Sequence, residues 1–271
     1  MTDALLAVGA ALLGVAVVGP LVAHAVSWWI GWRAVVPPLL GRVPDRDELG
    51  RPRAACARCG APQAPAGLPV RPGLALALRC PGCRAPLPSW LPAVELITAA
   101  LYGVAAAVVG PELVLVPVLV LVAGLVAMSA VDLAVMRIPS RFVYLTAAAV
   151  GAGLVVVSLV DDTPRRLWGA VLGAAVYGGM LLVLHLVSPR MLGFGDVRLA
   201  TLVGMAVGWA GWEAAHPLLA PVQAVLSAAL LAAVGGAVVG MVLLVVRGRD
   251  KPFPFGPAVA AAGLVVLLAA L

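Results

Sequence analysis

Charged side chains are scarce in this 271-residue sequence, where Asp, Glu, Lys and Arg together make up only 11% of the residues. Soluble domains have about a quarter of their residues charged, so the composition excludes a soluble globular fold. The sequence also has no convincing internal repeat, no phosphate-binding P-loop and no Ser/His/Asp set. None of its three histidines, His24, His185 and His216, is accompanied by a set of metal ligands.

Hydrophobic residues are abundant instead, at 63% of the chain. Apolar runs of about 20 residues recur, and each is long enough to cross a bilayer as a helix. We therefore expect an all-α, polytopic membrane protein with about eight transmembrane helices. The expected spans are residues 5–32, 90–109, 113–131, 141–160, 167–187, 197–212, 218–246 and 257–271.

The basic residues predict the orientation of these spans. With eight spans, sixteen of the eighteen Lys and Arg residues fall on one side of the membrane, and only Arg165 and Arg166 fall on the other. Cytoplasmic loops carry an excess of basic residues, so the arginine-rich side is expected to be cytoplasmic. The net charge of +6 is then explained by topology, and no nucleic-acid partner is needed to account for it.

Residues 33–89 form the only sizeable region outside the expected spans, and all four cysteines of the chain lie in it. Two Cys-x2-Cys pairs, Cys56 with Cys59 and Cys80 with Cys83, are separated by twenty residues. This spacing is typical of a tetrahedral four-cysteine zinc site, in which the metal has no open position and is structural. A disulfide or redox role is the weaker alternative on a reducing cytoplasmic side.

The cysteine pairs and the spans together predict the domain organisation. We expect a first transmembrane helix at residues 1–32, a cytoplasmic zinc-binding loop domain at 33–89 and a transmembrane domain at 90–271.

Two aspartates lie at the edges of apolar segments on the predicted cytoplasmic side. Asp196 ends the string Gly193-Phe194-Gly195-Asp196, and Asp132 follows the apolar run before it. A charge at mid-bilayer costs at least about 2.5–3.5 kcal/mol, so acids near membrane helices suggest function. The two carboxylates are candidates for general acid–base hydrolysis, and the two glycines would let backbone or substrate approach closely.

Glu95 is the only acid well inside an expected span. One interpretation is a first-turn acid that is stabilised by the helix dipole. The other is a side chain that lines the active-site cavity.

The ordered set of motifs resembles the type IV prepilin peptidases over roughly residues 25–260. The motifs are the two cysteine pairs, Leu91-Pro92-Ala93-Val94-Glu95-Leu96, Asp132 with Ile138-Pro139, Gly193-x-Gly195-Asp196-Val197-Arg198-Leu199, and Pro254-Phe255-Gly256-Pro257. The resemblance implies an intramembrane aspartic endopeptidase of the bacterial inner membrane. It would cut the leader peptide of prepilins or pseudopilins after a glycine, at the cytoplasmic face.

The resemblance also implies residue roles. Asp132 and Asp196 would be catalytic, the four cysteines would bind zinc, and Gly193, Gly195, Arg198 and Glu95 would support the site. Partners would be the N-terminal leader helix of a prepilin and the membrane lipid. Members with the cysteine loop typically also methylate the new N-terminus with S-adenosylmethionine.

The sequence departs from the family pattern at three places. Ser27-Trp28-Trp29-Ile30 lacks the usual asparagine, the stretch between the cysteine pairs lacks the usual serine, and Arg198 stands where lysine is usual. Arginine and lysine are not equivalent donors. Because of the three departures together, the methyltransferase activity stays open. A membrane transporter or assembly subunit, with the aspartates as an ion or proton relay, is the alternative from a different functional class.

Overall fold

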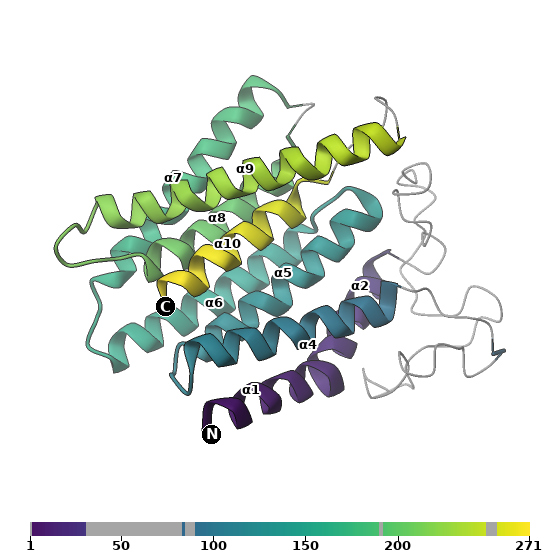
Figure 1. Cartoon of the computed structure of the whole chain (residues 1–271). Helices are drawn as coiled ribbons and strands as arrows, with labels where there is room; N and C mark the ends of the chain where they lie inside the picture. The colour runs from purple at the N-terminus through teal and green to yellow at the C-terminus, as the bar shows by residue number, and fades with distance from the viewer. Residues whose placement is uncertain (1, 31–82, 85–89, 190–191, 248–253) are drawn as a thin grey trace. The chain divides into compact units, whose positions relative to one another are not determined.

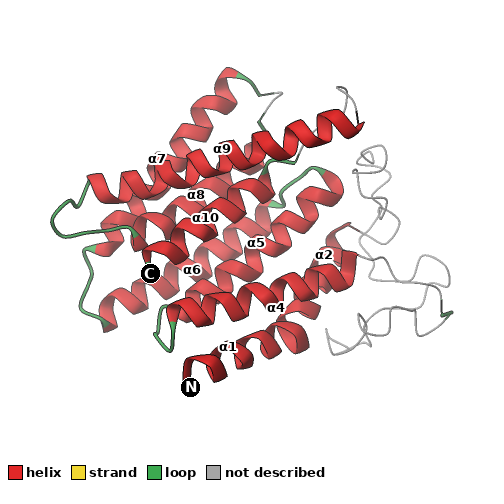
Figure 2. Ribbon diagram, in the orientation of Figure 1, coloured by secondary structure: helices red, strands yellow, loops and turns green. Residues whose placement is uncertain are grey.

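The computed structural model describes residues 2–30, 83–84, 90–189, 192–247 and 254–271. All regular secondary structure in these residues is helical (Figure 2), as the sequence predicts. The chain divides into two compact units, which are described separately. The first unit contains residues 1–111 and 122–136, and the second contains residues 112–121 and 137–271.

The first unit is built on helix α4 (Trp90–Val109). Helix α1 (Thr2–Leu13), a π-helical turn η1 (Gly14–Val18) and helix α2 (Gly19–Ile30) follow one another without a break and all contact α4 (Figure 1). A Cβ on Gly19 would lie 2.9 Å from the Cα of Glu95. The absence of that Cβ therefore lets α2 begin directly against the backbone of α4.

Helix α5 (Leu115–Val135) contributes to both units, because its residues from 122 onward belong to the first. It continues four residues beyond the predicted end of its span at residue 131. Asp132 thus lies in the last helical turn rather than after it. The chain leaves the helix at Met136, which has a positive φ of 52°, an uncommon conformation for a residue other than glycine.

The second unit surrounds helix α8 (Phe194–Ala210). Helix α8 contacts α6 (Ser140–Val160), α7 (Arg166–Val187), α9 (Leu219–Arg247) and α10 (Gly256–Ala270), as Figure 1 shows. Most residues of α8 after Asp196 are buried, and a helix that is apolar all round is expected to be enclosed by others. The helix begins three residues before the predicted span at 197, which places Asp196 in its first turn.

Helices α7 and α8 pack with their backbones close together. A Cβ on Gly173 of α7 would lie 2.8 Å from the Cα of Gly208 of α8. Small residues at membrane helix interfaces permit this approach, which increases van der Waals contact between helices. At the far end of α8 from Asp196, the buried Trp209 donates a hydrogen bond of 2.8 Å from Nε1 to Ser158 Oγ of α6.

Several described helices are suited to a membrane. Their outer faces expose large apolar side chains, including Leu145 at 71% and Val245 at 80% exposure. Five helical segments are long and apolar enough to cross a bilayer, which agrees with a polytopic membrane protein. They are Ala4–Ala23, Leu115–Ala134, Ser140–Val160, Arg166–Val187 and Leu219–Val245.

The packing of α7 on α8 predicts opposite effects for two glycine substitutions on α7. Gly173→Ala should destabilise the protein by about 1–3 kcal/mol, because the new methyl group must push α8 away. Gly179→Ala is the matched control, since a Cβ there meets no atom within 4 Å and alanine favours a helix interior by up to about 1 kcal/mol. Thermal unfolding of the purified variants in one detergent measures both. Equal stability of the two variants would contradict the close packing.

Candidate active site

Asp196 is held against the N-terminal end of α8 by reciprocal hydrogen bonds. Its backbone N–H donates to the carbonyl oxygen of Gly193 at 3.0 Å. The N–H of Gly193 donates in return to Oδ2 of Asp196 at 3.2 Å. This is the arrangement of an acidic N3 residue in a capping box. The free N–H groups and positive dipole end of the helix stabilise an anion at this position.

The two glycines before Asp196 leave room for different neighbours. A Cβ on Gly195 would lie 3.0 Å from Cβ of Ile138, in the segment that precedes α6. A Cβ on Gly193 would lie 3.3 Å from the Asp196 carboxylate itself. The Ile138 segment therefore passes close to the first turn of α8, and the carboxylate can fold back over its own backbone.

Arg198 links the first turn of α8 to the start of α6. Its Nη1 donates to the hydroxyl of Ser140, and its guanidinium lies 4.6 Å from the ring centre of Phe194 and 5.6 Å from that of Tyr144. No ion pair joins Arg198 to Asp196 within the part of the chain that the structure describes. Arg198 thus acts on the site through α6 and the aromatic rings, and its own Nε is buried without a hydrogen-bond partner.

His185, in the last turn of α7, supports the loop that leads to Asp196. Its Nδ1 lies 2.7 Å from the carbonyl oxygen of Leu192, and because a carbonyl only accepts, Nδ1 carries the proton. The His185 ring also lies 5.5 Å from that of Phe194. The ring of Phe194, two residues before Asp196, thus contacts His185 of α7 and Arg198 of its own helix.

Sequence reasoning left His185 and Ser140 without a role. The only signal for His185 in the sequence is its position seven residues before Leu192, near enough for a short turn to fold the loop back onto α7. No pattern in the sequence connects Ser140 with Arg198, because 58 residues separate them.

The remaining predicted acids belong to the first unit. Asp132 is buried at 6% exposure and Glu95 at 8%. Glu95 follows Val94, whose carbonyl accepts a 2.7 Å hydrogen bond from the hydroxyl of Thr98. Helix α4 begins at Trp90 and has no acidic residue in its first turn, so Glu95 lies in the second turn and its interpretation as a first-turn acid is wrong.

The predicted zinc ligands lie mostly outside the described residues. Cys56, Cys59 and Cys80 are not described, and Cys83 is half-buried. Within the described ranges, no group of three or more His, Cys, Asp or Glu side chains could hold a metal ion. Of the other predicted site residues, the second unit contains Gly193, Gly195, Asp196 and Arg198, which all lie at the start of α8.

These features define a class of protein: a helical, multi-pass membrane protein with aspartates in terminal turns of two of its helices. Comparison with known proteins then gives the family. Residues 119–241 match the type IV leader peptidase family, and residues 34–109 match the bacterial peptidase A24 N-terminal domain. The chain belongs to the type IV leader peptidase family and is a peptidase, so the predicted resemblance is confirmed.

Three relatives have the name prepilin leader peptidase/N-methyltransferase. The protein from Burkholderia pseudomallei strain 1026b is 36% identical over 241 residues, which cover 83% of this chain and 70% of the relative. The Aeromonas salmonicida strain A449 protein is 35% identical, with 83% and 74% covered. The Pseudomonas aeruginosa protein is 31% identical, with 88% and 80% covered. No solved structure matches the chain.

The hydrogen bond from His185 predicts which replacements preserve the Asp196 loop. Asparagine can place its amide N–H near the position of Nδ1, whereas glutamine places it one bond farther out and alanine removes it. We expect His185→Asn to retain most peptidase activity, and His185→Gln and His185→Ala to lose about tenfold or more, because small displacements of catalytic groups are costly.

Hydrogen exchange of the amides of residues 192–196 provides the second readout for these variants. Exchange should be faster in His185→Gln and His185→Ala than in His185→Asn. His216→Ala is the control, since His216 is an exposed histidine in the segment between α8 and α9. Equal activity and exchange in the asparagine and glutamine variants would refute the role of Nδ1.

Proposed function

We propose that the protein is an intramembrane aspartic endopeptidase that removes the leader peptide of type IV prepilins or pseudopilins. Cleavage would follow a glycine, at the cytoplasmic face of the bacterial inner membrane. The observation that carries the proposal is the Asp196 carboxylate, held by Gly193 at the start of a buried apolar helix. Family membership and the name of the relatives, prepilin leader peptidase/N-methyltransferase, support it.

The proposed chemistry uses Asp132 and Asp196 as a pair. One ionised carboxylate would activate a water molecule, while the protonated partner would donate to the carbonyl of the scissile peptide bond. A second negative charge about 4 Å away would cost about 4 kcal/mol at an effective dielectric near 20. The pair would therefore share one proton, and no covalent intermediate is required.

Two local features support this use of the aspartates. The N–H of Gly193 orients the Asp196 side chain before substrate arrives, so less reorganisation is needed during the reaction. Asp132 is buried in the last turn of α5, where contact with bulk water is limited. A buried carboxyl group is a candidate for chemistry, because burial perturbs its proton affinity.

The proposed substrate is the N-terminal helix of a prepilin. Its apolar part would enter between the membrane helices, and its basic leader would remain in the cytoplasm. Basic loop residues would repel such a leader, so we propose that acidic or polar side chains recognise it. The buried Glu95 of α4 is the candidate within the membrane domain.

The proposed topology has eight membrane helices, one in residues 1–32 and seven in residues 90–271, with the zinc-binding loop domain at residues 33–89 between them. The zinc-binding loop and the active site would both face the cytoplasm. Four cysteine thiolates are a donor set that Zn²⁺ prefers, and they fill all four positions of a tetrahedral site. The metal would therefore stabilise the loop, and S-adenosylmethionine would be the methyl donor if this chain shares the second activity in its relatives' name.

The aspartate pair predicts the outcome of two conservative substitutions. Asp132→Asn and Asp196→Asn should each lower cleavage of a prepilin leader by at least about 10³-fold, because each removes a proton-transfer group. Co-expression with a candidate prepilin, followed by mass spectrometry, measures leader removal and any added methyl group. Asp161→Asn is the control, since Asp161 is an exposed acid directly after the C-terminal end of α6.

The same assay distinguishes the proposed peptidase from the alternative, a transporter or an assembly subunit. A transporter or an assembly subunit would not release the leader, even without any substitution in its sequence. Substantial cleavage by either aspartate variant would remove that residue from the mechanism.

The proposed zinc site predicts a stoichiometry. Purified protein should contain about one zinc ion per chain, and the Cys56→Ser, Cys80→Ser double variant should lose it. Elemental analysis measures the metal, and limited proteolysis of the cytoplasmic loop should become faster when it is lost. A zinc-free protein would contradict the assignment. So would immediate loss of cleavage on chelation while the loop stays resistant to protease.

A further inference from the structure

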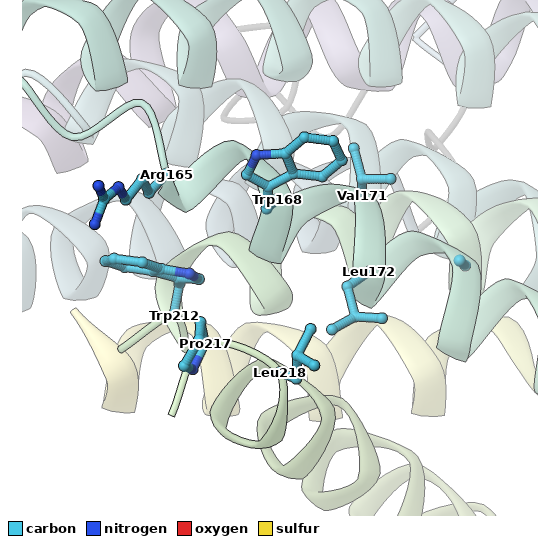
Figure 3. A pocket seen from close by; sticks show the side chains of 8 residues that line it. Arg165, Trp168, Val171, Leu172, Trp212, Pro217 and Leu218 are labelled. Carbon is cyan, nitrogen blue, oxygen red and sulfur yellow. The ribbon is translucent and has the colours of Figure 1, made fainter. Parts of the chain in front are cut away.

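A groove lies at the end of α7 that is remote from Asp196. It has a volume of about 520 Å³ and separates the first half of α7 from the segment that connects α8 to α9. We call it the interfacial groove and define it by Arg165, Trp168, Val171, Leu172, Trp212 and Leu218, which Figure 3 shows around one opening. Its volume is within the range of small-molecule sites, about 300–1,000 Å³.

The groove is separate from the candidate active site. It adjoins the start of α7 at Arg166, whereas His185, which supports the Asp196 loop, is in the last turn of the same helix. The 22 residues of α7 span about 33 Å at 1.5 Å per residue, about the thickness of the hydrocarbon core. The groove and Asp196 therefore lie near opposite faces of the membrane.

The walls of the groove match the depth of one lipid leaflet. The lining residues begin at Arg165, directly before α7, and recur at helical spacing along α7 through Trp168 and Leu172 to Ala175. This stripe is about 15 Å long, or half of a hydrocarbon core of about 30 Å. Trp168 is 73% exposed, and tryptophan is enriched where membrane helices meet the headgroups.

The groove has one cationic side chain at its mouth. Arg165 is exposed, and its side chain makes no hydrogen bond or ion pair within the described residues. Its neighbour Arg166 instead lies over the ring of Trp209, 5.0 Å from its centre. Asp161 and Asp162 are exposed nearby but do not line the groove. A guanidinium free to form paired hydrogen bonds is well suited to a phosphate group.

We propose that the interfacial groove binds one glycerophospholipid molecule. Its phosphodiester would contact Arg165, and one acyl chain would lie along Val171 and Leu172. Trp168 and Trp212 would flank the junction between headgroup and chain.

Photo-crosslinking tests the proposal on the full-length protein in nanodiscs. The probe is a phosphatidylglycerol or phosphatidylethanolamine with a photoreactive group in the middle of one acyl chain. Label should concentrate on residues 168–175 and 212–218. Arg165→Gln should reduce it by about fivefold, since one basic contact to a headgroup contributes about that factor. Ala175→Trp, at an exposed position, should fill the groove and displace the chain.

Two controls make the result specific. Arg141→Gln removes another exposed arginine, at the start of α6 and outside the groove, and should leave the label unchanged. Peptidase activity should persist in the groove variants, so failure of this proposal is distinguishable from failure of the proposed function. An excess of glycerophosphate, which has no acyl chains, should not compete.

Four outcomes would overturn the proposal. Label spread equally over exposed faces, such as Leu230 and Val234 of α9, would indicate only surrounding bilayer lipid. Label that is unchanged in Arg165→Gln would refute headgroup recognition. Competition by glycerophosphate alone would indicate a site for free phosphate. Displacement by a prepilin leader peptide would assign the groove to the substrate.

Discussion

The second unit depends on one constraint, a carboxylate held at the start of an apolar, buried helix. Removing the Asp196 anion from water would be costly without hydrogen bonds. The N–H of Gly193 and the end of α8 supply that stabilisation locally. This explains why the acid lies in the first turn of α8, where free N–H groups are available, and why the helix carries no charge after Arg198.

The neighbouring helices keep that first turn in place. Helix α7 holds Phe194 and the Leu192 carbonyl through His185, while α6 engages Arg198 through Ser140 and Tyr144. Farther along α8, Gly173 and Gly208 let α7 approach closely enough to fix its direction. The acid is thus positioned by side-chain contacts near the loop and by close backbone packing behind it. Such support would keep an acid of a type IV leader peptidase in a fixed position.

Much of the secondary structure could be predicted from the sequence. Five helices begin and end within one or two residues of the predicted spans: α4, α6, α7, α9 and α10. A helix in lipid must satisfy its backbone hydrogen bonds internally, so the length of the apolar run alone predicts its bounds. The errors fell at the two aspartates. An apolar run in the sequence ends at a charged residue, so the predicted spans stopped at the aspartates. The helices themselves continue through Asp132 and begin before Asp196, because a charged side chain does not interrupt backbone hydrogen bonding.

The sequence by itself determined the helical class, the acids worth testing and the family, because each rests on composition or on residues close along the chain. Only the tertiary structure decided which side chains surround Asp196 and where a lipid could bind. Ser140 and Arg198 are far apart in the sequence, and Arg165 meets Trp212 at one groove only after α7 and α8 have packed. Such contacts depend on the direction and spacing of packed helices, which no local pattern in the sequence encodes.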